Sequence, residues 1–183
     1  MKQFILFFFC SLLIGSSCRK PKPVDPVKLL PPETQTGANT FGCLLNGQVF
    51  KPKGDPFAGP VIKAQYQLVN GKQGFGISAS RRNGDVREGI GVAGDSVKLF
   101  EGVFELAQVD AGRFVAGYTY RDLNTISGIQ YGTTATNRGQ LTITKFDTVN
   151  QIISGRFWFD AIDTTTGKIV QIREGRFDLP YVK

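Results

Sequence analysis

The side chains that could do chemistry in this sequence are carboxylates, because the chain contains no histidine. Without histidine, Ser-His and Cys-His nucleophile pairs and histidine metal sites are excluded. A glycan hydrolase needs only two carboxylates at a suitable separation, and Asp160 and Glu174 flank the last expected hairpin, across which they could approach each other. The carboxylates considered are Glu88, Asp160, Glu174 and Asp178. We favour solvent-facing strand charges paired with nearby arginines, and we assign no catalytic residue.

Trp158 is the most suggestive single residue. Strand alternation sends Trp158, Arg156 and Asp160 to the face opposite Phe157 and Phe159. An exposed indole between polar groups can stack on a sugar ring or anchor a protein partner. These three residues are therefore a candidate binding surface, with the alternative that the N-terminal segment or another strand covers the indole.

No motif predicts a cofactor or a metal. Residues 160–167 (DAIDTTTG) contain calcium-loop residue types but lack the alternating oxygen ligands of an EF-hand loop, so we expect a plain hairpin loop. Gly84, Gly89, Gly91 and Gly94 fall within β-type sequence and do not form a phosphate loop. The formal charge of +7 comes without a basic stripe interleaved with aromatics, so nucleic acid is not an expected partner.

The first 17 residues have the layout of a secretory signal. Lys2 gives a positive start, residues 4–14 are almost wholly apolar, and three small residues then precede Cys18. The apolar run is about half of the roughly 20 residues that a membrane-spanning helix needs. We therefore expect residues 1–17 to be removed rather than retained as an anchor.

Residues 14–18 (IGSSC) resemble the lipobox of bacterial lipoproteins, whose cysteine is acylated before cleavage on its amino side. We expect Cys18 to anchor the protein to a membrane. Gly15 stands where leucine is commonest, so ordinary signal-peptidase cleavage is the alternative. With Cys18 acylated, Cys43 is the one free thiol of the mature chain, which excludes an intramolecular disulfide. We expect Cys43 to be a buried, small apolar residue.

The prolines separate a tether from a domain. Five of the nine prolines lie between residues 21 and 32, and none lies between Val61 and Leu179. Residues 18–39 are therefore expected to form the lipidated cysteine and a disordered, proline-rich tether, reaching at most roughly 60 Å. Residues 40–183 are enough for one β-rich globular domain.

Three Asn-Gly pairs predict hairpins, because Asn-Gly suits the type I′ turn. Around Asn70-Gly71, a two-residue loop places three apolar or amphipathic pairs on one face: Tyr66 with Phe75, Ala64 with Ile77, and Ile62 with Ala79. The other face carries polar or very small residues. We call Gly74, Gly76 and Ser78 on this face the bare strip, and we expect these small residues to let residues 31–40 pack against the sheet.

The remaining turns extend the β pattern. Asn83-Gly84 predicts that Arg82 pairs with Asp85, Ile77 with Ile90, and Phe75 with Val92, and Asn46-Gly47 predicts that Cys43 pairs with Phe50. Near the C-terminus, an odd number of loop residues at Thr148-Val149-Asn150 would place Leu141 opposite Phe157 and Ile143 opposite Gly155. A bulge near Glu174-Gly175 would bring all apolar positions of the last strand to one face. No segment shows helical periodicity. The prediction is an all-β chain with a single antiparallel β-sandwich or barrel-like domain of about eight to ten strands.

Segments at both ends resemble a widespread group of lipoproteins from the Bacteroidota. The opening is residues 30–43 (LPPETQTGANTFGC), and the closing segments are residues 153–159 (ISGRFWF) and 174–178 (EGRFD). The resemblance implies an envelope lipoprotein with a β-rich domain of unknown function, and it brings no catalytic residues. Surface display in such bacteria is associated with acidic residues after the lipidated cysteine. Arg19 and Lys20 stand there instead, which favours the periplasmic face of the outer membrane over the cell surface.

Together these patterns predict a non-enzymatic envelope lipoprotein. Its β domain is expected to bind a partner, either an envelope protein or a glycan. The enzymatic alternative is a carboxylate-dependent glycan hydrolase, and a purely structural module of a larger complex is a third possibility. No cofactor is expected, and the oligomeric state does not follow from the sequence.

Overall fold

The computed structural model describes residues 24–54, 60–69, 71–108, 112–125 and 127–183. The signal segment and Cys18 lie outside the described residues, so the expectations for them remain predictions. Among the described residues, no helix has the length and apolar character needed to cross a membrane.

The regular structure is almost entirely β, which confirms the predicted fold class. One short 3-10 helix, η1 (Pro26–Leu29), precedes the strands. The eleven strands of the described chain are β1 (Thr40–Leu45), β2 (Gln48–Phe50), β3 (Ile62–Val69), β4 (Lys72–Asn83), β5 (Val86–Gly94), β6 (Gly102–Leu106), β7 (Phe114–Asp122), β8 (Gly128–Gly132), β9 (Gly139–Asp147), β10 (Ile152–Ile162) and β11 (Ile169–Pro180). They exceed the expected eight to ten, and β8 is the strand for which the sequence showed no alternation pattern.

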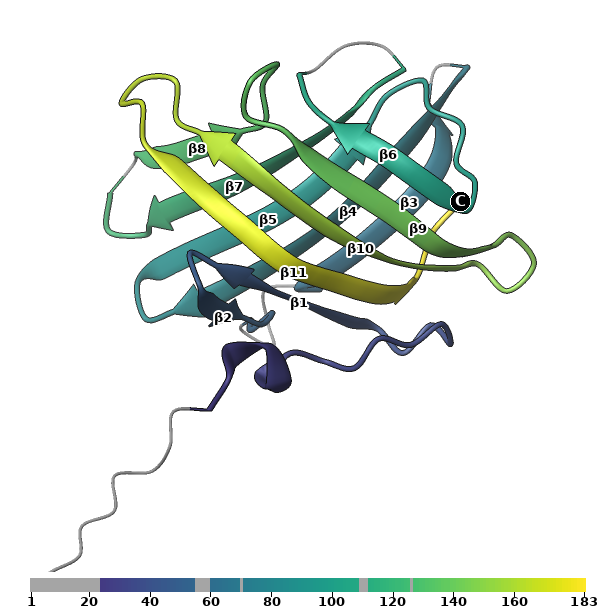
Figure 1. The fold of residues 1–183 in the computed structure, drawn as a ribbon, viewed down its shortest axis with the longest axis horizontal. Helices are drawn as coiled ribbons and strands as arrows, with labels where there is room; N and C mark the ends of the chain where they lie inside the picture. Colours follow the sequence, from purple (N-terminus) through teal and green to yellow (C-terminus); the bar gives the residue numbers. More distant parts are fainter. Residues whose placement is uncertain (1–23, 55–59, 70, 109–111, 126) are drawn as a thin grey trace, which may run out of the picture.

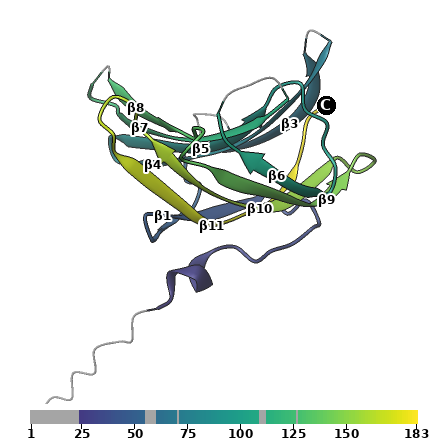
Figure 2. The same cartoon turned by 45° about the horizontal axis from the view of Figure 1, so that its top comes forward.

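The strands form one bent sheet in the order β2-β1-β11-β10-β9-β6-β7-β5-β4-β3. In Figures 1 and 2 the half formed by β1, β11, β10 and β9 faces the half formed by β7, β5, β4 and β3, and β6 lies between them at one end. β8 also joins the halves, because it pairs with both β7 and β10. Pairing within the sheet is antiparallel except for one parallel contact between β6 and β7. This arrangement is compatible with a sandwich or barrel-like description.

The C-terminal residues bond to β3 and so close the remaining open side of the bent sheet. The backbone N–H of Tyr66 in β3 donates to the Val182 carbonyl at 2.8 Å, and the Val182 N–H donates to the Ala64 carbonyl at 3.1 Å. The two halves of the bent sheet thereby enclose one hydrophobic core. Its largest fully buried side chains include Phe50, Phe159, Ile77, Leu141 and Ile172.

The predicted register of β3 and β4 is confirmed at every pair, from Val69 opposite Lys72 to Ile62 opposite Ala79. The predicted register of β4 and β5 is wrong. Asn83 stays in β4 and pairs with Val86, so the two-residue loop is Gly84-Asp85. Glycine at the first loop position, here with φ +58°, suits a tight hairpin turn.

The shift in the β4–β5 register keeps the buried face but changes the partners. Ile77 lies opposite Val92, and Phe75 lies opposite Gly94. Arg82 lies opposite Arg87 rather than Asp85. The expected cation–carboxylate pair is thus replaced by a pair of like charges.

The other predicted pairings are confirmed. Cys43 pairs with Phe50, and Leu141 pairs with Phe157. The loop between β9 and β10 has four residues rather than an odd number, and a register shift between Ser154 and Gly155 produces the expected pairs. Cys43 is fully buried, and burial raises the pKa of its thiol to about 12 despite the nearby Arg81 guanidinium. The Cys43 thiol is therefore not accessible to reagents in solvent.

The predicted bulge in β11 is also confirmed. Phe157 pairs with Gly175 and Phe159 with Ile172, so β11 has an extra residue between these pairs. Glu174 adopts φ +54° in this stretch. The apolar residues on both sides of the bulge are buried, namely Val170, Ile172, Phe177 and Leu179.

The described N-terminal segment packs against the domain, contrary to the expected disordered tether up to residue 39. Leu30 is buried, and a Cβ atom at Gly42 would lie 2.6 Å from the Pro31 ring, so β1 and this segment approach closely. Glu33 forms an ion pair with Arg156 of β10, with Nη2 and Oε2 2.5 Å apart. The segment therefore lies against the half of the sheet that contains β1, β10 and β11, as Figure 2 shows.

Asp178 in β11 holds this segment. Asp178 is only 1% exposed. Its carboxylate accepts hydrogen bonds from the backbone N–H groups of Thr36, Gly37 and Ala38 at 2.8 to 3.1 Å. The Thr34 hydroxyl donates at 2.6 Å. Hydroxyls of Thr36 and Ser154 complete the donors. The globular unit thus begins near residue 30 and not at residue 40.

Candidate functional site

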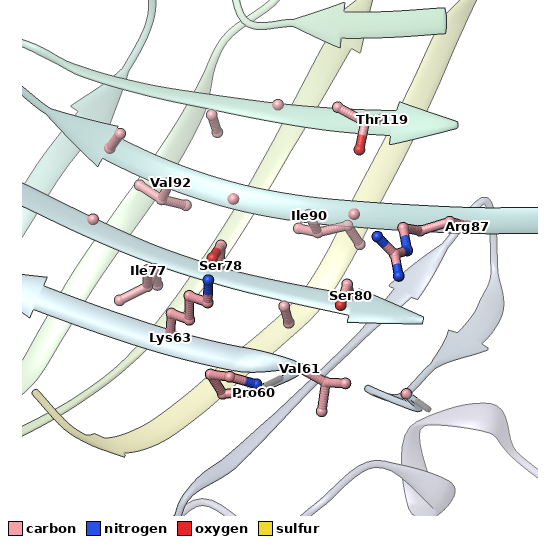
Figure 3. A pocket seen from close by; sticks show the side chains of 18 of the residues that line it. Pro60, Val61, Lys63, Ile77, Ser78, Ser80, Arg87, Ile90, Val92 and Thr119 are labelled. Atoms are coloured by element: carbon pink, nitrogen blue, oxygen red, sulfur yellow. The ribbon is translucent and has the colours of Figure 1, made fainter. Parts of the chain in front are cut away.

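A groove of about 670 Å³ lies on the outer face of β3, β4, β5 and β7. Alternation explains its floor. Ile77 and Ala79 of β4, and Ile90 and Val92 of β5, point into the core, so the residues between them face outward. Figure 3 shows labelled lining residues on all four neighbouring strands.

The outward positions of β4, β5 and β7 are small, and their pairing arranges them in three rows across the sheet. We call these nine residues the groove floor. The rows are Gly76, Ala93 and Val115; Ser78, Gly91 and Gly117; and Ser80, Gly89 and Thr119.

Internal packing explains only some of the glycines in the groove floor. A Cβ atom at Gly89 would lie 2.7 Å from the Thr119 hydroxyl, and one at Gly117 would lie 2.9 Å from the Tyr131 carbonyl oxygen. At Gly76 and Gly91 the nearest atoms would be 3.5 and 3.4 Å away, which are ordinary contacts. Since neither Gly76 nor Gly91 has a positive φ, the chain itself does not require glycine there.

Three arginines continue the same face as a fourth row. Arg82 lies opposite Arg87, and Arg87 lies opposite Arg121. We call these the arginine row. Like charges directly opposite each other destabilise a sheet. Arg82 donates from Nε to the Gly84 carbonyl at 3.0 Å.

The other cations at the groove have no internal counterion in the described structure. Arg87, Arg121, Lys53 and Lys63 form no ion pair with any described carboxylate. Lys63 pairs with Ser78 and so belongs to the second row, on the β3 side of the groove floor. Figure 3 shows Lys63 and Arg87 on strands at either side of β4.

The groove floor offers few hydrogen-bonding groups. β4 pairs with both β3 and β5 along the floor, and β5 pairs with both β4 and β7. The backbone groups of these strands are therefore engaged within the sheet. None of the described lining residues is acidic or aromatic.

The predicted surface around Trp158 lies elsewhere, on the outer face of β10. Trp158 is 42% exposed, so the described N-terminal segment does not cover it. The Arg173 guanidinium lies 5.5 Å from the Trp158 ring centroid and forms an ion pair with Asp160 at 2.6 Å. Arg156 is held by Glu33. The structure thus places all three predicted residues on one face, but two of them already have charged partners.

The candidate carboxylates are each engaged by other groups of the fold. Asp160 pairs with Arg173, and Glu174 pairs with Arg176 at 3.4 Å. Neither Asp160 nor Glu174 lines either described cavity. Asp178 is occupied by the donors described above. This arrangement gives a carboxylate-dependent hydrolase no support.

Glu88 belongs to a buried polar cluster under β5. It pairs with Arg81 at 2.6 Å and accepts a hydrogen bond from the Tyr118 hydroxyl at 2.9 Å. Burial raises the pKa of the Tyr118 hydroxyl well above its usual range, and the hydrogen bond to Glu88 raises it further. The Arg81 guanidinium also lies 4.7 Å from the Phe50 ring centroid. These contacts satisfy the charge of Glu88 inside the fold.

The segment with calcium-loop residue types forms a turn. Asp163 accepts hydrogen bonds from the Thr165 N–H at 2.9 Å and the Thr166 hydroxyl at 2.5 Å. Its pKa is lowered by these two bonds. Across the described residues, no group of three or more metal-binding side chains is present.

The bare strip was visible in the sequence, but the segment expected to pack on it was wrong. Residues 31–40 were expected to cover it, whereas the described N-terminal segment packs on the other half of the sheet. The arginine row was missed because the expected register gave Arg82 a carboxylate partner. Counting from the correct loop, Gly84-Asp85, would have placed Arg82 opposite Arg87.

The fold and the groove define a small, single-sheet β protein with an open candidate binding groove. The chain belongs to a family described as a domain of unknown function, DUF6252, which matches residues 69–179. The match includes the whole groove floor and the arginine row. Searches of the curated proteins and of the solved structures returned no match to this chain.

Proposed function

We propose that this protein is a lipid-anchored envelope protein of the Bacteroidota and that its β domain is a non-enzymatic binding module. The signal layout and the lipobox resemblance around Cys18 support the anchor. Arg19 and Lys20 favour the periplasmic face of the outer membrane. The binding site in this proposal is the groove on β3, β4, β5 and β7.

One observation carries the binding role. The groove floor keeps glycine at Gly76 and Gly91, although a Cβ atom would meet only ordinary contacts at either position. Glycine in a strand interior costs stability and often marks the close approach of a ligand or of another backbone. A bound partner that lies directly on the sheet accounts for this choice.

The anchor is tested by mass spectrometry of the membrane fraction. The expected product begins at Cys18 and carries a diacylglyceryl group on its sulfur. A Cys18→Ser variant should move from the membrane fraction to the soluble fraction. A wild-type product that is soluble, unmodified and cut at another residue would contradict the anchor.

The groove is tested with Gly91→Leu, which adds bulk to the groove floor without a backbone clash. After cross-linking in the native envelope and purification, the wild-type protein should retain bound molecules that Gly91→Leu loses. Thr142→Leu is the matched control, because Thr142 lies between the buried Leu141 and Ile143 and so faces outward on the other half of the sheet. Equal retention by all three proteins would contradict the groove.

The Trp158 surface supports a second candidate site, for a glycan or an envelope protein. The half-exposed indole is the observation that favours it. A Trp158→Ala variant should then lose glycan-array or pull-down signals that Gly91→Leu keeps. Unchanged binding by Trp158→Ala removes this candidate.

A further inference from the structure

We infer that the groove binds a long-chain anionic amphiphile, with its acyl chain on the groove floor and its carboxylate or phosphate head at the arginine row. The inference rests on the binding role proposed for the groove and specifies the ligand. Its evidence is the chemistry of the groove floor, the length of the groove and the position of the cations.

The groove floor selects an apolar body for the ligand. The backbone groups beneath it are paired within the sheet, and its side chains provide only the hydroxyls of Ser78, Ser80 and Thr119. A sugar or a peptide laid on this floor would lose hydrogen bonds to water and gain few in return, which is costly. An acyl chain has no such groups to satisfy. Among the lining residues that the structure describes, none offers the aromatic ring on which a sugar usually stacks.

The dimensions of the groove suit one extended chain. Gly76 and Arg82 are six residues apart on β4, which is about 20 Å along a strand. β4 and β7 are separated by β5 alone, which is about 10 Å across the sheet. A volume of about 670 Å³ lies within the usual range of small-molecule sites.

The cations at the groove favour a ligand with an anionic head group. Arg87 and Arg121 lie directly opposite each other and have no described carboxylate partner. A carboxylate or phosphate between them would convert a like-charge repulsion into charge-assisted hydrogen bonds, which guanidinium groups form in a bidentate manner. Lys63 adds positive charge at the β3 side. The groove is therefore mainly apolar along its floor and cationic at the arginine row, with the Lys63 cation beside the second row.

Binding is measured on the mature chain from residue 18 onward with Cys18→Ala, so that no attached lipid competes. Palmitate and palmitoyl lysophosphatidic acid are the probes, both below their micelle concentrations. Glyceryl monopalmitate is the neutral probe of the same chain length, and inorganic phosphate is the probe without a chain. We expect one equivalent of each anionic amphiphile to bind, the neutral probe to bind at least about tenfold more weakly, and inorganic phosphate not to compete.

Variants separate the two parts of the groove. Arg87→Gln and Arg121→Gln should weaken palmitate binding about tenfold and leave the neutral probe unchanged. Gly91→Leu should abolish binding of both, and Ser78→Leu provides the same blockage should Gly91→Leu fail to fold. Arg138→Gln and Thr142→Leu, both outside the groove, should leave all affinities unchanged. Added salt should weaken palmitate binding more than binding of the neutral probe.

Two results would overturn the inference: no palmitate binding, or equal affinity for palmitate and the neutral probe. Binding of an acidic peptide in place of palmitate, lost in Gly91→Leu, would likewise overturn the ligand assignment while the groove remained a binding site. If Gly91→Leu and Ser78→Leu bind palmitate like the wild type, the proposed groove fails as well.

Discussion

At the scale of a single residue, Asp178 connects the two ends of the described chain. Its carboxylate is almost fully buried, and burial by itself raises its pKa. The hydrogen bonds from Thr34, Ser154, Ala38 and Thr36 outweigh that effect and hold the pKa well below the usual range. The charged form of Asp178 therefore stabilises the packing of the N-terminal segment.

An Asp178→Asn variant should lower the free energy of unfolding by about 2 to 4 kcal/mol, because an amide cannot accept all of the donors and presents its own N–H groups to some of them. Urea denaturation measures this change. Glu33→Gln is the control, since it removes the exposed ion pair to Arg156 and a longer one to Arg176, which together are worth about 1 kcal/mol. Equal losses in the two variants would contradict the role of Asp178.

The lowered pKa of Asp178 also predicts a dependence on pH. A carboxyl whose folded pKa lies below its unfolded value of about 3.9 contributes its full stability above that value. The contribution is lost as pH falls from about 4 toward the folded pKa. Stability measured from pH 6 down to pH 2 should therefore fall more steeply in the wild type than in Asp178→Asn. Parallel pH profiles would show that another carboxylate dominates.

At the scale of the elements, the alternation of apolar and polar residues predicted the strands, and the turn residues predicted most of the strand registers. Asn70-Gly71 placed β3 against β4 correctly, and the change of phase in the last strand located the bulge in β11. At Asn83-Gly84 the loop could use Asn-Gly or Gly-Asp, since either places glycine at a central position. Local residues did not decide between them, and that choice sets the partners of Arg82.

The bulge in β11 gives a prediction at this scale. Glu174 adopts φ +54°, which costs an ordinary residue roughly 1 kcal/mol. Glu174→Gly should therefore keep or slightly raise the free energy of unfolding, although it removes the exposed ion pair with Arg176. Glu174→Val should lower it, because a β-branched side chain is disfavoured at positive φ. Thermal denaturation gives the order of the three proteins, and a Val variant as stable as the Gly variant would contradict it.

At the scale of the whole molecule, the two outer faces of the bent sheet differ in what covers them. The N-terminal segment covers part of the half containing β1, β10 and β11, whereas the other half presents the groove. The sequence could not reveal this division, because Asp178 and the residues it holds are separated by some 140 positions. The proline content indicated only where the strands begin.

A truncation tests the extent of the globular unit. A chain that starts at Thr40 lacks the buried Leu30 and the hydrogen bonds from Thr34 to Ala38 to the Asp178 carboxylate, so its free energy of unfolding should be about 3 to 5 kcal/mol lower than that of a chain that starts at Val24. Urea denaturation of the two chains measures the difference. Equal stability would restore the boundary at residue 40.

Asp178 follows the segment that it holds by some 140 residues, which also sets an order of events during biosynthesis. Ribosomes make the segment from Thr34 to Ala38 well before they make its anchoring carboxylate. Until Asp178 has been added and β11 has joined the sheet, this segment lacks the acceptor of its hydrogen bonds. Protease cleavage near Gln35 is therefore expected to be faster in chains that lack a docked β11, and resistance there should report that β11 has joined the sheet.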